Sequence, residues 1–269
     1  MDISTIAILI FCGMFSNIMS ALFGIGGGVL MVPILMTVFK DFPIQMVAAT
    51  SLSIVIATAC INLAYFIKQK IKVSIVATIL WSLGMIIGVQ LGFELSFFIH
   101  ENIIVGIFIT TMLILSFKTF LSSRKDLKGE IVPVGVGDLA KGSAFTTIGG
   151  AIAGLTGIGG GSIMAPLINQ LSCVHKTQVA IYSNYMMVLG GLGSMYGYLT
   201  KDSPYIMPNT YQIGYINLTV ISIVVLASFI TSFFSMRLRK KLSKRFTDLA
   251  LGCILFLIAL YTSCLKFVF

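Results

Sequence analysis

Long uninterrupted apolar segments limit the fold of this chain more than any other feature of its sequence. A helix needs about 20 apolar residues to cross the hydrocarbon core of a bilayer. Only 10% of the residues are charged, whereas a soluble domain carries about a quarter. The apolar segments therefore predict an all-α polytopic membrane protein. They cover residues 4–22, 44–67, 73–99, 102–121, 143–156, 178–199, 212–236 and 246–265.

The chain also contains an internal repeat. The stretch ALFGIGGGVLMVP at residues 21–33 returns as GLTGIGGGSIMAP at residues 154–166, and at the same shift Gln45 matches Gln178. Self-similarity of this extent predicts two copies of one structural unit. The first repeat covers residues 1–121, a polar linker covers 122–137 and the second repeat covers 138–269.

The distribution of lysine and arginine predicts how the repeats are oriented. Each repeat starts with a glycine-broken segment, residues 4–39 or 138–172, and continues with three unbroken ones. If the broken segment returns to the side from which it entered, every basic residue except Lys40, Lys201 and Lys266 lies on one face of the membrane. If it crosses once, the basic residues divide almost evenly. Because basic residues concentrate on the cytoplasmic side, the first arrangement is predicted.

Each repeat is then a glycine-broken helical hairpin plus three transmembrane helices, and the two repeats have inverted topology. Both termini are expected outside the cytoplasm, with the linker and residues 237–245 inside. The broken segments have about 35 residues, whereas two full crossings need about 40 residues plus a turn. We therefore expect a long helix followed by a short one, with the glycine tip inside the membrane. The sequence leaves open whether the hairpins re-enter or cross fully.

The glycine clusters GIGGG, at residues 24–28 and 157–161, break the helices. Interrupted helices at corresponding positions of inverted repeats are typical of secondary transporters and mark the binding site. Glycine leaves the backbone accessible, and the helix that follows presents free N–H groups and the positive end of its dipole. Such ends bind anions. A nucleotide phosphate loop is excluded, because no strand–loop–helix context surrounds the glycines.

Close helix packing is the alternative role for any glycine. We prefer binding for the two GIGGG clusters and packing for two other groups that lie within unbroken segments. These groups are Gly84, Gly88 and Gly92, and Gly190, Gly191, Gly193 and Gly197.

No predicted span carries a charged residue near its middle, since Glu94 and Asp248 lie toward segment ends. A carboxylate proton relay or a cationic substrate would favour such a residue. We therefore predict a small anionic substrate. The net charge of +9 reflects basic cytoplasmic loops, and no nucleic-acid partner is expected. A coupling ion, proton or sodium, stays open.

Catalysis finds little support in the sequence. His100 and His175 lie beside the membrane, and no cluster has metal-site spacing. The five cysteines form no CxxC pair and fit as small core-compatible side chains. We therefore predict no enzymatic activity, no catalytic residues, no cofactor and no metal site.

Polar residues recur at matched positions after each hairpin: Thr50 and Ser51 in the first repeat, and Ser183 and Asn184 in the second. Each could contact the substrate or bond a neighbouring helix, and the sequence does not separate these roles. Gln45 and Gln178 are interpreted as helix caps at the membrane interface.

The repeated GIGGG…P hairpin, followed by Gln and then by Thr-Ser or Ser-Asn, resembles the TauE/SafE family. These are sulfite and organosulfonate exporters, also called the 4-toluene sulfonate uptake permease family. The motifs FGIGGGVLMVPIL and TGIGGGSIMAPLI carry the resemblance, which extends over nearly the whole chain. It implies a secondary transporter of small sulfur-containing anions, such as sulfite, sulfonates or sulfoacetate, in the bacterial inner membrane.

Carried onto this chain, the resemblance implies a substrate site at the two glycine clusters. Because Tyr182 stands where the first repeat has Ala49, we expect an asymmetric site with Tyr182 or Tyr185 as a shape filter. The expected substrate-binding residues are Gly26, Gly27, Gly28, Gly159, Gly160, Gly161, Thr50, Ser51, Ser183, Asn184 and Tyr182.

Transport by alternating access is the leading hypothesis, with the lipid bilayer and the small anion as the expected partners. A passive anion channel and, less favoured, a membrane-embedded sensor or enzyme are the alternatives. The sequence leaves the substrate, the direction of transport and the oligomeric state open.

Overall fold

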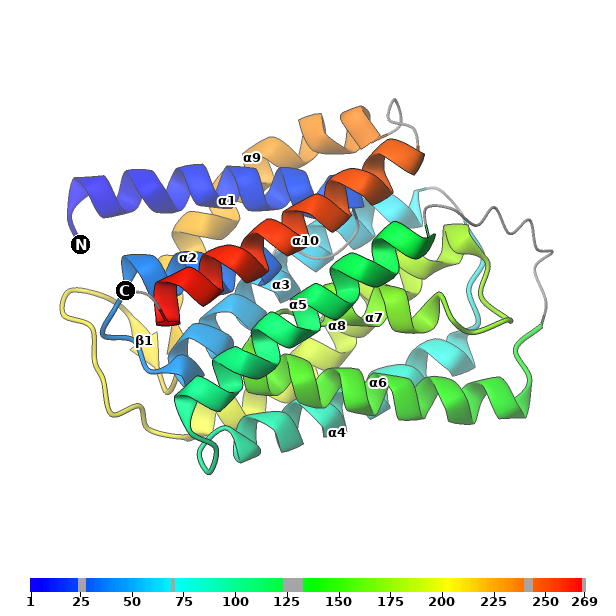
Figure 1. Ribbon diagram of the computed structural model, residues 1–269, viewed down its shortest axis with the longest axis horizontal. Coiled ribbons are helices and arrows are strands. Elements are labelled where there is room, and N and C mark those ends of the chain that lie inside the picture. Colours follow the sequence, from blue (N-terminus) through cyan, green and yellow to red (C-terminus); the bar gives the residue numbers. More distant parts are fainter. Residues whose placement is uncertain (24–27, 69–70, 123–132, 240–243, 268–269) are drawn as a thin grey trace.

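The computed structural model describes residues 1–23, 28–68, 71–122, 133–239 and 244–267. Almost every described element is a helix (Figure 1). The part of the chain predicted as the first repeat contains α1 (Ile3–Phe23), α2 (Gly28–Val38), α3 (Ile44–Ile67), α4 (Ile75–Leu95) and α5 (Glu101–Ser122). The second contains α6 (Val136–Thr156), α7 (Gly160–Ile168), α8 (Lys176–Thr200), α9 (Leu218–Arg239) and α10 (Lys244–Phe267).

Both glycine-broken segments have the expected form of a long helix followed by a short one. The 21-residue α1 precedes the 11-residue α2, and the 21-residue α6 precedes the 9-residue α7. Each short helix has a proline inside it, Pro33 or Pro166. Both prolines lie beyond the first turn, where proline removes a backbone hydrogen bond and disfavours continuation of the helix.

Five of the described helices are long and apolar enough to cross a membrane: α1, α3, α4, α5 and α10. The apolar part of α9 is shorter, covering Leu218–Ser232. The protein is thus a polytopic integral membrane protein. The central helix is α3, because 78% of its span is buried, against 28% for the spans in α1 and α10.

Two short strands depart from the purely helical prediction. β1 (Gln212–Ile213) and β2 (Ile216–Asn217) form an antiparallel pair with Ile213 opposite Ile216. The predicted apolar segment 212–236 therefore becomes a helix only from Leu218. The reason is local, because Asn217 accepts the N–H of Val220 with Oδ1 at 3.1 Å, which is the geometry of a helix N-cap.

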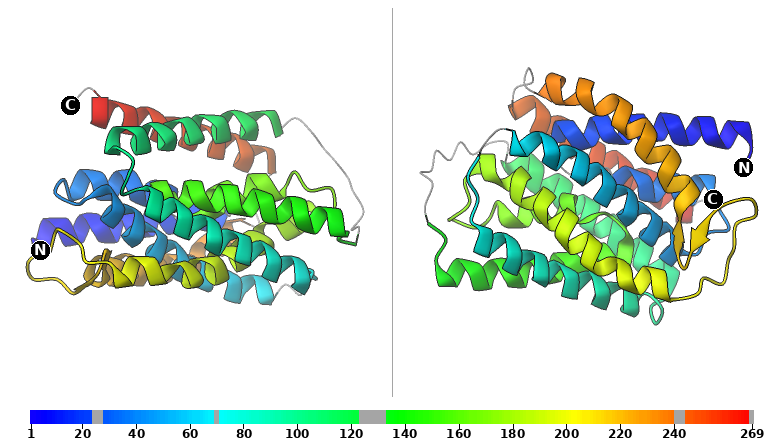
Figure 2. Two further views of the ribbon diagram at one scale, coloured as in Figure 1. Left: turned by 90° about the horizontal axis from the view of Figure 1, so that it is seen from below. Right: turned by 180° about the vertical axis from the view of Figure 1, so that it is seen from behind.

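The start of α1 and the end of α10 lie at one end of the bundle, and the ends of α3, α5 and α9 lie at the other (Figures 1 and 2). Gln45, near the start of α3, donates to the carbonyl oxygen of Ser96, after the end of α4, at 2.9 Å. Gln178, near the start of α8, donates to the carbonyl oxygen of Lys72, before the start of α4, at 2.7 Å. Since these contacts lie at opposite ends of α4, α3 and α8 run in opposite directions.

Glycines allow α4 to approach α6 closely. A methyl group on Gly88 would lie 2.9 Å from the backbone nitrogen of Ala151, and one on Gly84 would lie 2.9 Å from the carbonyl oxygen of Ser143. On α6, a methyl group on Gly150 would lie 2.8 Å from the carbonyl oxygen of Met85. The packing role predicted for the α4 glycines is confirmed.

The glycines of α8 also pack against neighbouring helices. Methyl groups at these positions would overlap the side chains of Met85, Ile56, Ile86 or Gln90. The packing role predicted for this group is therefore confirmed as well. Its members are Gly190, Gly191, Gly193 and Gly197.

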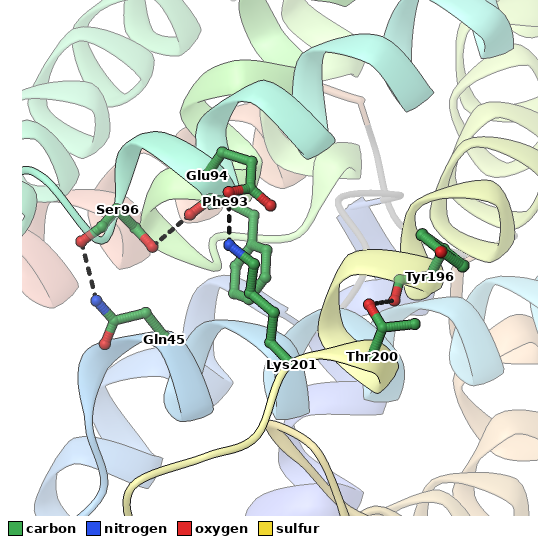
Figure 3. A network of polar contacts seen from close by, with 7 residues as sticks. All are labelled: Gln45, Phe93, Glu94, Ser96, Tyr196, Thr200 and Lys201. Atoms are coloured by element: carbon green, nitrogen blue, oxygen red, sulfur yellow. Dashed lines mark hydrogen bonds and ion pairs between the residues drawn. The ribbon is translucent and has the colours of Figure 1, made fainter.

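A polar and aromatic cluster joins α4 to the residue after α8 at the end of the bundle that holds the termini (Figure 3). Lys201 forms an ion pair with Glu94, and its ammonium nitrogen lies 4.3 Å from the ring centroid of Phe97. Tyr198 packs its ring on Phe93, with the centroids 4.3 Å apart. These contacts connect the first repeat to the second at this end.

Candidate functional site

The two glycine-broken hairpins meet inside the protein. A methyl group placed on Gly28, the first residue of α2, would lie 2.8 Å from the carbonyl oxygen of Ile158 and 3.1 Å from Cα of Gly159. Methyl groups on Gly28 and Gly159 would also both overlap Val55. Because Val55 lies midway between the ends of α3, the meeting point is near the middle of the central helix.

The backbone of the second hairpin turns at two glycines with left-handed conformations. Gly157, with φ of 72°, ends α6 and donates its N–H to the carbonyl oxygen of Ala153 at 2.8 Å. Gly159, with φ of 78°, precedes α7. Residues with a Cβ adopt this region reluctantly. The glycines are therefore needed for the turn itself, independently of any ligand.

The turn leaves the start of α7 without a side-chain cap. The first N–H groups of a helix have no partner within the helix, and they carry the positive end of its dipole. Gly159, Gly160 and Gly161 are all buried. A buried helix N-terminus of this kind favours negative charge.

Ser51 connects the two hairpins from the middle part of α3. Its Oγ lies 2.9 Å from the carbonyl oxygen of Gly157 and 3.3 Å from that of Gly28, and the hydroxyl donates toward both. The residue is fully buried. A single hydroxyl therefore fixes the end of α6 against the start of α2.

Ser183 approaches the second hairpin from α8, and Asn184 follows it in the same helix. Ser183 donates to the carbonyl oxygen of Gly161 at 3.4 Å. Asn184 donates from Nδ2 to the carbonyl oxygen of Ala180 at 2.7 Å, within its own helix. The Oδ1 atom of Asn184 is buried, and no described residue forms a hydrogen bond with it.

Two predicted site residues point to other parts of the molecule. Thr50 accepts the N–H of Asn217 on β2 at 3.4 Å. Tyr182 accepts the N–H of Ser74 at 2.8 Å, and its ring packs on Trp81 with the centroids 5.1 Å apart. Tyr182 is therefore held toward the start of α4, on a different side of α8 from the Ser183 contact.

The predicted site residues Gly26 and Gly27 lie outside the described residues.

The interpretation of Gln178 as a helix cap is confirmed. Its Oε1 accepts the N–H of His175 at 3.0 Å, before the first turn of α8. Gln45 joins α3 to the end of α4 instead.

Sequence reasoning missed Val55 and Asn217. Val55 of α3 lies against both hairpins where they meet, but it is one of many apolar residues in an apolar helix and carries no distinguishing signal. Asn217 had a readable signal, since an asparagine before an apolar segment is typical of a helix N-cap. It also links α9 to Thr50 of the first repeat.

The residues at which the hairpins meet are distant in the sequence from charged residues. Every Asp, Glu, Lys and Arg whose position is described lies in a connecting segment or within two turns of a helix end. In the part of the chain that the structure describes, no group of three His, Cys, Asp or Glu side chains could hold a metal ion. The site offers hydroxyls, amides and a helix N-terminus.

Comparison with known proteins gives a match over most of the chain. The family model described as "Sulfite exporter TauE/SafE" matches residues 9–262. A Haemophilus influenzae protein named "Probable membrane transporter protein" is 51% identical over 269 residues, covering 100% of both chains. A Methanocaldococcus jannaschii protein with a similar name is 29% identical over 273 residues, covering 94% of each chain. No solved structure gives a significant match.

Proposed function

This chain belongs to the sulfite exporter TauE/SafE family, and from this premise we propose that it is a secondary transporter of a small, sulfur-containing anion. The coarser conclusion, a membrane transporter, follows from the family and from relatives named as transporters. The proposed substrates are sulfite, sulfonates or sulfoacetate-like anions. The proposed location is the cytoplasmic membrane, with both termini outside.

We infer that the transporter is built from two inverted repeats. In support, each half has the same order of a long helix, a short helix and three further helices. The corresponding helices α3 and α8 run in opposite directions, as their contacts with the two ends of α4 require. The packing of α4 on α6 has a counterpart in the packing of α1 on α9, where a methyl group on Gly13 would lie 2.8 Å from the carbonyl oxygen of Val224.

The meeting of Gly28 and Gly159 midway along α3 carries the proposal. Two helices start there, α2 at Gly28 and α7 at Gly160, and helix N-termini favour anions. Interrupted helices near the membrane midplane are the usual substrate site of transporters with inverted repeats. We propose that the substrate binds to the amides of both glycine clusters, with Ser51, Ser183 and Asn184 beside them.

Alternating access requires the two repeats to move relative to each other. Ser51 is placed to couple the hairpins to α3, because its hydroxyl donates toward carbonyl oxygens of both. A substrate between the helix ends would then be exposed to one side of the membrane at a time, as in other inverted-repeat transporters.

The proposal is tested by flux in proteoliposomes that contain the purified protein. Sulfite and a small organosulfonate are offered with an imposed proton or sodium gradient, and uphill accumulation is expected, which a passive channel cannot produce. We expect Gly160→Val to abolish flux while the protein still inserts, because a branched side chain covers the amides at the start of α7. The matched control is Gly106→Val, since the space around Gly106 is open. Equal transport by wild type and Gly160→Val would contradict the site, and binding without flux would indicate a sensor.

A further inference from the structure

A second buried polar cluster lies between α1, α3 and α9. It contains Asn17 and Ser20 of α1, which are fully buried, and Asn62 of α3, which is 1% exposed. Asparagine in an apolar interior is unfavourable unless its amide finds partners on both sides. The hydrogen bonds of these residues therefore indicate what the cluster can bind.

The amide of Asn17 has a fixed orientation. Its Nδ2 donates to the carbonyl oxygen of Ser228 at 2.6 Å and to Oγ1 of Thr231 at 3.2 Å. Because the Ser228 carbonyl can only accept, the nitrogen must face α9 and the oxygen must point elsewhere. Oδ1 of Asn17 is buried and has no hydrogen-bond partner among the residues that the structure describes.

The amide of Asn62, on α3, is bonded in a similar way. Its Nδ2 donates to Oγ of Ser20 at 3.2 Å, and its buried Oδ1 has no hydrogen-bond partner in the described part of the chain. Asn17 and Ser20 are three residues apart on α1 and so are neighbours on its surface. Two buried asparagines, each with an Oδ1 atom that lacks a partner among the described residues, thus lie on either side of Ser20: Asn62 bonds it and Asn17 neighbours it on α1.

The position of the cluster favours a cation. Ser20 lies in the last turn of α1, where the helix dipole places partial negative charge. In transporters with broken helices, C-terminal helix ends hold the coupling cation and N-terminal ends hold the anionic substrate. Here the end of α1 and the start of α2 belong to the same hairpin.

The chemistry of the cluster selects among cations. Divalent cations are usually bound through carboxylates, and a proton site in a membrane usually uses Asp, Glu or His. Asn17, Ser20 and Asn62 are neutral, and the buried atoms of the two asparagines that lack a hydrogen-bond partner among the described residues are both oxygens. Neutral oxygen ligands at a helix C-terminus match a monovalent alkali cation.

We propose that Asn17, Ser20 and Asn62 form a sodium site that couples the proposed anion transport to the sodium gradient. The inference rests on the proposed transport function for its physiological role, but sodium binding itself does not depend on the identity of the anion. Sodium at the end of α1 neutralises part of the charge of an anion bound at the start of α2. Each ligand then raises the affinity for the other.

Two measurements test the site separately from the substrate. The first is the thermal stability of the purified protein in sodium chloride, potassium chloride and choline chloride at equal ionic strength, because a ligand that binds the native state raises the apparent melting temperature. The second is sulfite uptake into proteoliposomes with a sodium gradient or a proton gradient of equal size. We expect saturable stabilisation by sodium alone and uptake driven by the sodium gradient.

Asn62→Leu removes one oxygen ligand and is expected to raise the half-saturating sodium concentration by at least about tenfold. Asn102→Leu is the matched control, because Asn102 is an exposed asparagine in α5. If Asn62→Leu does not fold, Ser20→Ala makes a smaller change in the same cluster and is expected to act in the same direction.

Three results would overturn the sodium site. One is equal stability of the wild type in all three salts, a second is uptake that follows only the proton gradient, and the third is unchanged sodium response in the folded Asn62→Leu or Ser20→Ala variant. Sodium-specific stabilisation without flux of any offered anion would instead contradict the proposed transport function and leave the sodium site supported.

Discussion

The hydroxyl of Ser51 donates a hydrogen bond of 2.9 Å to the carbonyl oxygen of Gly157, joining α3 to the end of α6 in the other repeat. The same hydroxyl lies 3.3 Å from the carbonyl oxygen of Gly28. The contact places one small side chain between both glycine-broken hairpins. The arrangement makes Ser51 the most direct connection between the helix breaks and the central helix.

Ser51→Ala removes the hydroxyl that bridges the hairpins. We expect a loss of about 1 kcal/mol in the free energy of unfolding, since interhelical hydrogen bonds in membranes are worth roughly that much, together with a reduced rate of anion uptake. Ser53→Ala is the matched control, because Ser53 is also buried on α3 but donates to Ala49 within its own helix at 2.8 Å. Equal uptake rates in the two variants would contradict a coupling role for Ser51.

Gly159→Ala tests the backbone conformation at the meeting point. A non-glycine residue at φ of 78° is destabilised by about 1–2 kcal/mol, and the added methyl group would also lie 2.6 Å from Val55. We expect a lower melting temperature and loss of transport. Gly106→Ala is expected to be neutral or slightly stabilising, since it lies within a helix with open space around it. Comparable melting temperatures for the two variants would speak against strain at Gly159.

Gly88→Leu tests the close approach of α4 and α6. Its side chain would meet the backbone of Ala151 and Thr147, and backbone cannot move aside as a flexible side chain can. We expect the helices to separate and the purified protein to lose its single peak in size-exclusion chromatography. Leu83→Ala, at an exposed position of the same helix, should elute as the wild type does. Normal elution of Gly88→Leu would show that the interface is looser than the contacts indicate.

The ion pair between Lys201 and Glu94 joins the repeats at the end that holds the termini (Figure 3). Both side chains are more than a third exposed, so we expect the pair to add only about 0–1 kcal/mol to the free energy of unfolding. Its effect on transport should be larger if this end opens during the cycle. We predict that Lys201→Met, Glu94→Gln and the double variant give non-additive uptake rates in a double-mutant cycle. Additive rates would mean that the pair does not act as a unit during transport.

Cys173, in the segment between α7 and α8, is expected to resist alkylation. Burial raises the pKa of its thiol above the ordinary value of 9.0, and the neighbouring Asp138 carboxylate raises the pKa further. Because the thiolate is the reactive form, maleimide labelling of the folded protein should be slow at pH 8. Asp138→Asn should increase the labelling rate by lowering this pKa, and an unchanged rate would remove Asp138 as a cause.

The raised pKa of the Cys173 thiol makes the folded protein less stable at alkaline pH. A pKa raised in the folded state means that the unfolded state releases its proton first as the pH rises. The contribution of Cys173 to stability is therefore complete below the unfolded pKa of 9.0 and is lost as the pH rises through the folded pKa. Cys173→Ser should weaken the alkaline decline of the melting temperature.

Features that depend on local sequence could be predicted without the structure. Apolar length predicted the five described helices that are long and apolar enough to cross a membrane. The glycine clusters and the length of each broken segment predicted its division into a long helix and a short one. Four-residue glycine spacing predicted the packing of α4. Each of these depends on hydropathy, chain stiffness or backbone conformation within one segment, and these properties belong to the residues themselves.

Contacts between segments required the tertiary structure. The bridge from Ser51 to Gly157, the direction of Tyr182 toward Ser74 and the buried amide oxygens of Asn17 and Asn62 all depend on how the helices are rotated about their axes. A helix that is apolar on every side has no preferred buried face, so its sequence does not specify that rotation. The amino-acid sequence determined where this chain enters the membrane and where its helices break. Only the packing of the ten described helices against one another decided which polar atoms meet at those breaks.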